Sequence, residues 1–82
     1  MPARVKNKKR LRNITGKAIQ RIRMATRPRI TQEDMAGRLA RLGLHINQSQ
    51  VAKIESGDRQ ILDVELAAFA KALKVQVQML FE

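Results

Sequence analysis

Four side chains between positions 48 and 53 have the chemistry needed to contact the edges of base pairs. The Gln48 amide matches adenine N6 and N7, and the Lys53 ammonium can reach guanine O6 and N7 or a phosphate. Ser49 can donate or accept a hydrogen bond, and the Ala52 methyl group suits a thymine methyl. At helical spacing these groups lie away from the apolar residues of the same stretch. We therefore predict a face for base contacts; the alternative is a polar face that only meets solvent.

Candidate phosphate-binding groups flank this face. Gln32 is expected in the first turn of a helix, where free backbone amides and the positive end of the helix dipole favour an anion. Its side chain can hold a phosphate oxygen and brace Gln48; the alternative is a solvated glutamine. We assign phosphate contacts to Asn47 and Arg29 as well. For Gln50 we expect either a capping role or a contact to a base or a phosphate, and the sequence favours neither.

Two consecutive helices are expected to begin with the same local chemistry. The four positions involved are Ile30, Thr31, Asp34 and Met35 in the first, and Ile46, Asn47, Gln50 and Val51 in the second. In each, a cap side chain accepts from a first-turn amide, a polar side chain reaches back to the cap, and an apolar pair closes over the start. With stops at Gly43 and Gly57, the pattern predicts helices over Gln32–Leu42 and Gln48–Ser56.

Three further helices are expected around this pair. Apolar residues at helical spacing predict a first helix over Thr15–Ala25, with Ile14 on its inner stripe. Asp63 is expected to cap a fourth helix, whose inner face holds Leu66, Phe69, Ala70 and Leu73. A short final helix is predicted at Val77–Phe81; the alternative is a strand over residues 75–78, where polar and apolar side chains alternate.

The chain has 82 residues and a net charge of +10, which is unevenly distributed. Met1–Gln32 contains no acidic residue. Few apolar side chains and strong like-charge repulsion predict a flexible, disordered arm over Met1–Arg12, followed by one domain over residues 13–82. The arm's cations are Arg4, Lys6, Lys8, Lys9, Arg10 and Arg12. The arm suits a phosphate track or a minor groove; the alternative is a solvated tail that only aids solubility.

The composition also argues against several classes of protein. There is no cysteine for a disulfide or a thiolate metal site. No apolar run approaches the roughly 20 residues that span a bilayer, and no secretory signal follows the basic N-terminus, so a cytoplasmic, nucleoid-associated location is expected. His45 is the sole histidine, and no Gly-rich phosphate loop or metal-ligand spacing occurs. We expect neither an enzyme nor a cofactor or metal.

Three segments of the chain resemble one known family. They are Thr-Gln-Glu-Asp-Met-Ala at 31–36, Gln-Ser-Gln-Val-Ala-Lys-Ile-Glu-Ser-Gly-Asp-Arg at 48–59, and the apolar stretch 66–75. Together they are similar to the Cro/phage-repressor family of helix-turn-helix proteins (the xenobiotic-response-element type), over roughly Ile14–Phe81. Two features depart from that family: the segment from Ala36 to Val51 is longer than usual, and Lys74 stands where glycine is common.

The resemblance implies an all-α, compact five-helix bundle of the lambda-repressor type. It implies a sequence-specific transcriptional regulator of bacterial or phage type, typically a repressor, which binds a pseudo-palindromic double-stranded operator as a homodimer. Arg59 would contact the phosphate backbone, with an idle surface arginine as the alternative, and Glu55 would pair with Arg23 inside the protein. Leu80 and Phe81 are the apolar side chains left over for a dimer contact.

Two other functions stay open at this point. A basic arm on a small helical domain equally suits an RNA-binding or ribosome-associated protein, although the scarcity of aromatic residues argues against base stacking on single strands. An antitoxin-like protein-interaction module, gripping a partner through its tail or last helix, is the second alternative.

Overall fold

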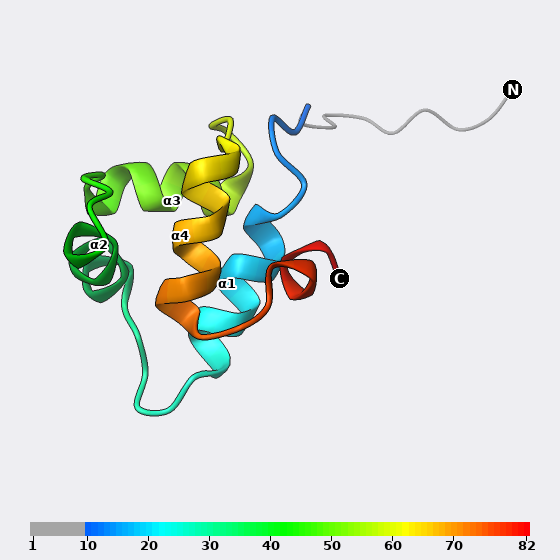
Figure 1. The fold of residues 1–82 in the computed structure, drawn as a ribbon. Coiled ribbons are helices and arrows are strands. Elements are labelled where there is room, and N and C mark those ends of the chain that lie inside the picture. The colour runs from blue at the N-terminus through cyan, green and yellow to red at the C-terminus, as the bar shows by residue number, and fades with distance from the viewer. Residues whose placement is uncertain (1–9) are drawn as a thin grey trace, which may run out of the picture.

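Four α-helices and one short 3-10 helix form the fold in the computed structural model, which describes residues 10–82 (Figure 1). They are α1 (Gly16–Ala25), α2 (Gln32–Arg41), α3 (Gln48–Ser56), α4 (Asp63–Leu73) and the 3-10 helix η1 (Val77–Phe81). The described residues contain no strand, so the strand alternative at 75–78 is wrong. The fold is therefore all-helical and compact, as predicted.

The paired helix starts are confirmed. The Thr31 hydroxyl accepts from the Asp34 amide at 2.9 Å, and the Asp34 carboxylate accepts from the Thr31 amide at 3.0 Å. Asn47 and Gln50 make the same reciprocal bonds at 2.9 and 3.0 Å. Each pair satisfies backbone donors that a helix start leaves without an intrahelical partner, which is why both helices begin where the sequence predicts.

The start of α4 differs from the prediction. Asp63 is the first residue of the helix and Leu62 is its N-cap. The predicted cap bond from Asp63 is absent; instead the Glu65 carboxylate accepts from the Leu62 amide at 3.0 Å. Glu65 can do so because it stands at the third helical position, from which a side chain reaches back to the cap.

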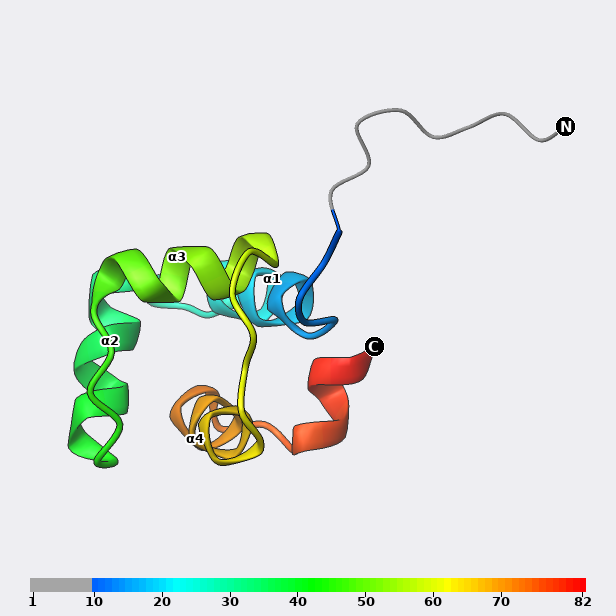
Figure 2. The same ribbon diagram turned by 90° about the horizontal axis from the view of Figure 1, so that it is seen from above.

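Helix α3 lies against α1 and α2, while α4 packs on α2 and α1, and η1 covers α1 and α4 (Figure 2). Their shared core is aliphatic apart from one aromatic ring. Its fully buried apolar members are Ile19, Ile30, Met35, Leu39, Val51, Ile54, Phe69 and Leu80. Burial of this surface holds α3, because a nine-residue helix is unstable alone in water.

Three apolar residues do not lie where they were predicted. Ile14 is 73% exposed because it precedes the first helical residue and leaves the inner stripe. Leu42 was predicted on the inner stripe of the second helix with Met35 and Leu39, but it is 43% exposed because α2 ends at Arg41 and the backbone of Leu42 leaves helical geometry. Leu80 is fully buried on the inner side of η1, so it is unavailable as a dimer contact, whereas Phe81 is 55% exposed.

A residue with left-handed backbone geometry follows each of α2, α3 and α4. Gly43 and Gly57 have φ values of 90° and 84°, as expected for glycine stops. Lys74 has φ of 61°, so the position at which the family commonly has glycine does adopt the conformation that favours glycine.

The last residues of the predicted arm are docked on the fold. The Arg12 amide donates to the Gly57 carbonyl at 2.9 Å, and the Leu11 side chain lies over Gly57. Arg10 is exposed. Residues 1–9, including Arg4, Lys6, Lys8 and Lys9, lie outside the described residues, as does the prediction that this part of the arm is flexible. The described chain thus begins at the C-terminal end of α3.

Candidate nucleic-acid interface

The outward side of α3 carries the side chains predicted to contact bases. Gln48, Ser49 and Lys53 are exposed, and Ala52 is half-buried. Val51 and Ile54, on the opposite side of the helix, are fully buried against the core. The prediction from helical spacing is therefore confirmed for both sides of α3: the apolar side packs on the core, and the polar side faces away from the fold.

A line of hydrogen bonds connects this polar side to the buried centre of the fold. Gln48 Nε2 donates to Gln32 Oε1 at 2.7 Å, and Gln32 Nε2 donates to Glu55 Oε1 at 2.9 Å. Glu55 in turn accepts two bonds from the Arg23 guanidinium, at 2.6 and 2.9 Å. The side-chain amide of Gln48 is consequently oriented by α2 and the core before it meets any ligand.

The predicted ion pair between Arg23 and Glu55 is present and buried, since the two residues are 8% and 6% exposed. Arg23 also donates to the Ile30 carbonyl at 2.8 Å, at the end of the connection between α1 and α2. Burying an ion pair costs desolvation energy, which the remaining hydrogen bonds help to offset. The pair thus joins α1, α3 and the start of α2 at one point.

The candidate phosphate-binding residues differ in how many of their hydrogen-bonding groups already have partners within the protein. Gln50 Oε1 accepts the Asn47 amide and Asn47 Oδ1 accepts the Gln50 amide, so both side chains act as caps. The Gln50 amino group is not used by that pair. Gln32 bonds on both sides within the protein, which confirms that it braces Gln48. Arg29 is exposed, and its side chain makes no hydrogen bond with other described residues.

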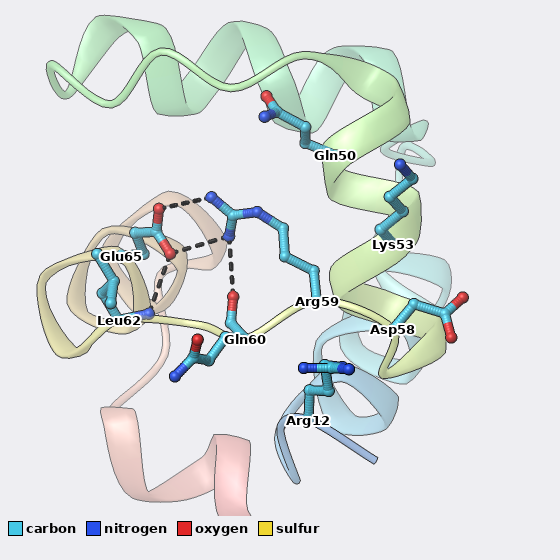
Figure 3. Close-up of a pocket in the computed structure, with 8 residues that line it drawn as sticks. All are labelled: Arg12, Gln50, Lys53, Asp58, Arg59, Gln60, Leu62 and Glu65. Atoms are coloured by element: carbon cyan, nitrogen blue, oxygen red, sulfur yellow. Dashed lines mark hydrogen bonds and ion pairs between the residues drawn. The ribbon is translucent and has the colours of Figure 1, made fainter. Parts of the chain in front are cut away.

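An open hollow of about 600 Å³ lies at the C-terminal end of α3 (Figure 3). Gln50 and Lys53 project from α3 on one side, Glu65 lies across from them on α4, and Arg59 extends between the two. Arg12 lines the same hollow from the start of the described chain. Three cations and the carboxylates of Asp58 and Glu65 therefore line one concave surface that continues from the outward side of α3.

The guanidinium of Arg59 is held by a carboxylate that sequence reasoning missed. Arg59 donates to the two carboxylate oxygens of Glu65, each at 3.0 Å, and to the Gln60 carbonyl at 3.1 Å. The bond from Arg59 lowers the pKa of Glu65 despite its burial, and the Leu62 amide adds to this. The same bond raises the pKa of Arg59. The predicted phosphate contact of Arg59 would thus begin from a positioned side chain.

Asn13 is a second structural residue that the sequence reasoning missed. Its Nδ2 donates to the carbonyls of Ile54 and Arg59 at 3.1 and 2.7 Å, while its Oδ1 accepts from the amides of Thr15 and Gly16 at 3.1 and 2.6 Å. One side-chain amide therefore bonds the start of α1 to both the last turn of α3 and the loop after it. An Asn just before a predicted helix was the available signal for the first role.

Nothing among residues 10–82 groups three or more potential metal-binding side chains, and no described helix is long and apolar enough to cross a membrane. No family model, curated protein or solved structure matches this chain. The interface is therefore interpreted from its own geometry.

Proposed function

We propose that this chain is a sequence-specific, double-stranded DNA-binding transcriptional regulator of the Cro/phage-repressor type. In this proposal α2 and α3 form a helix-turn-helix, with α1, α4 and η1 as the rest of a five-helix bundle. Helix α3 enters the major groove, where Gln48, Ser49, Ala52 and Lys53 contact bases. Regulation of transcription, typically repression, follows from occupancy of an operator.

The observation that carries the proposal is the line of bonds from the buried Glu55 through Gln32 to Gln48. A glutamine that is already oriented loses less side-chain entropy when it forms two bonds to adenine, and discrimination between bases requires such fixed donors and acceptors. A solvated surface glutamine has no need of this support. The exposed Ser49 and Lys53 extend the same side of α3.

The phosphate contacts of the proposal surround the base-contacting side. Gln32 and Asn47 lie at the two helix starts, where backbone amides favour anions, and Arg29 lies just before α2. Arg59 and Gln50 line the hollow beside α3. A net charge of +10 supplies the attraction that such a set of contacts needs.

A homodimer on a pseudo-palindromic site is part of the proposal and rests on the family resemblance. Two copies would present their α3 helices about 34 Å apart, the length of one duplex turn. Of the two terminal residues considered for the contact, the exposed Phe81 is retained and the buried Leu80 is not.

Selection of bound sites from random duplex DNA, followed by footprinting, tests the proposal. The wild type should enrich one sequence, and a variant with Gln48, Ser49 and Lys53 changed to alanine should lose that preference. The control is Lys17→Ala with Gln20→Ala, which removes the same charge from exposed positions on α1. Unchanged selectivity in the α3 variant, or tighter binding to structured RNA at matched salt, would refute the proposal.

A further inference from the structure

A second concentration of positive charge lies away from α3. It borders a hollow of about 310 Å³ between the C-terminal ends of α2 and α4. The lining residues are Arg38, Arg41, Leu42, Lys71, Ala72 and Lys74, and we call this surface the basic hollow. Within the described part of the chain, no carboxylate lines it. It has no role in the function proposed for α3.

The geometry of α2 separates the basic hollow from the outward side of α3. The first residue of α2, Gln32, bonds to the first residue of α3, so the two helix starts are adjacent. Ten helical residues span about 15 Å, which carries Arg41 to the far end of α2. Helix α4 likewise runs away from α3 towards its own C-terminal end (Figure 1). A ligand in the basic hollow and a duplex on α3 would therefore not compete for space.

Three of the four cations have no partner among residues 10–82. Arg38 donates to the Ala72 carbonyl at 3.0 Å, which joins α2 to α4, and Asp34 lies one turn earlier on the same helix. Arg41, Lys71 and Lys74 are exposed, and within residues 10–82 their side chains make no hydrogen bond or ion pair. Three unpaired cations around one concave surface repel each other, so an incoming anion would relieve that repulsion.

Cations at helix C-termini are common because they stabilise the helix dipole, and this accounts for part of the cluster. It does not account for the exposed Leu42 beside Ala72 in the same hollow. Interfaces with nucleic acid are polar and strongly charged, whereas protein interfaces combine an apolar centre with a charged rim. An exposed leucine among the cations favours a peptide over a phosphate backbone.

We propose that the basic hollow docks an acidic segment of a partner protein that also carries an apolar side chain. The apolar side chain would lie on the exposed Leu42, and its flanking carboxylates would meet Arg41, Lys71 and Lys74. Arg38 would hold the two helices in place through the Ala72 carbonyl. The proposal is independent of DNA binding by α3, although the two surfaces together would let the chain hold a duplex and a protein at once.

Titration of the full chain with a fluorescent 12-residue peptide, in which glutamates and aspartates surround one leucine, tests this proposal. Fluorescence anisotropy at fixed salt gives the dissociation constant. Arg41→Gln with Lys74→Gln should weaken binding at least tenfold. The control, Lys17→Gln with Arg21→Gln, removes the same charge from α1 and should weaken binding less than twofold. Replacing the peptide's leucine with glycine should also weaken binding to the wild type severalfold.

Three results would overturn the proposal. The first is that the wild type shows no saturable peptide binding, and the second is that the hollow and control variants lose peptide affinity equally. The third is that Arg41→Gln with Lys74→Gln weakens the binding of an unrelated 12-base-pair duplex but leaves peptide binding unchanged. Thermal melts of both variants check that the fold is intact. Gln48→Ala with Lys53→Ala should retain peptide binding, so failure of the DNA proposal and failure of this one give different results.

Discussion

Gln32 and Gln48, the first residues of α2 and α3, are joined side chain to side chain by a 2.7 Å hydrogen bond. The bond exists because both helices start from capped ends that lie next to each other. It makes one glutamine the support of the other, and Glu55 supports both.

This relationship predicts energetic coupling in DNA binding. Gln32→Ala should weaken operator binding by about 1 kcal/mol, because Gln48 loses the bond that orients it. Gln48→Ala should cost about 1–3 kcal/mol and relax selectivity at one base pair. The double variant should lose less than the sum, with a coupling of at least about 0.5 kcal/mol, measured by titrating the selected operator at fixed salt. Additive losses would mean that the bond does not serve binding.

The buried ion pair predicts a large stability effect. Glu55→Ala should lower the free energy of unfolding by about 3 kcal/mol, because it leaves the buried Arg23 guanidinium without its carboxylate. Urea denaturation measures this loss. The matched comparison is the double variant Arg23→Met with Glu55→Ala, which removes the stranded charge and should recover part of the stability. A loss below about 0.5 kcal/mol for Glu55→Ala would contradict a structural role for the pair.

Local patterns explain how much of this molecule could be predicted from its sequence. The doubled capping pattern and the glycine stops fixed α3 to the residue and α2 to within one, because those signals act over four or five neighbouring positions. The positions of Gln48, Ser49 and Lys53 followed from helical periodicity once the helix was placed. The Arg23–Glu55 pair, by contrast, came only from the family resemblance.

Contacts between distant segments could not be predicted from the sequence. Asn13 bonds to Arg59, 46 positions later, and no periodic pattern reports such a pairing. Leu80 was expected to be available because its burial depends on how η1 folds back on α1 and α4. Arg59 was assigned to phosphate from the family resemblance, and its Glu65 partner was not predicted. In each case tertiary packing decided the outcome.

Two glycines inside helices predict opposite responses to the same substitution. Gly37→Ala should stabilise the fold by about 0.5–1 kcal/mol, since an alanine methyl group there would have no neighbouring atom within 4 Å and alanine favours the helix. Gly16→Ala should destabilise it by about 1–3 kcal/mol, because the methyl group would collide with the Ile54 carbonyl oxygen. Thermal or urea unfolding of the two variants checks both signs. Equal effects would contradict the close approach of α1 to α3.

The Arg59–Glu65 pair predicts acid sensitivity. Glu65 has a pKa below its ordinary value of 4.5 in the folded chain, mainly because Arg59 donates to it. The folded state then binds fewer protons than the unfolded state near that pH. The stabilisation is therefore complete above about pH 4.5 and is lost as the pH falls through the folded pKa.

Glu65→Gln tests this directly. It should lower the free energy of unfolding by about 1–2 kcal/mol at pH 7. The difference from wild type should shrink as the pH falls through the lowered pKa of the folded Glu65, because the wild-type carboxylate then becomes protonated as well. Urea denaturation over a series of acidic pH values gives the comparison. Glu33→Gln, at an exposed position of α2, serves as the control and should stay within about 0.5 kcal/mol at pH 7. A difference that does not change with pH would assign the loss to packing alone.

Shortening the basic arm should change the salt dependence of DNA binding. Removal of residues 1–9 takes away Arg4, Lys6, Lys8 and Lys9 but leaves Leu11 and Arg12 docked on Gly57. Each arm cation that neutralises a phosphate contributes about 0.9 to the slope of log K against log salt, so the shortened chain should show a flatter slope. Its preference for the selected operator should persist, because the base contacts belong to α3. Titrations across a range of salt concentrations measure both quantities, and an unchanged slope would assign the arm to a partner other than DNA.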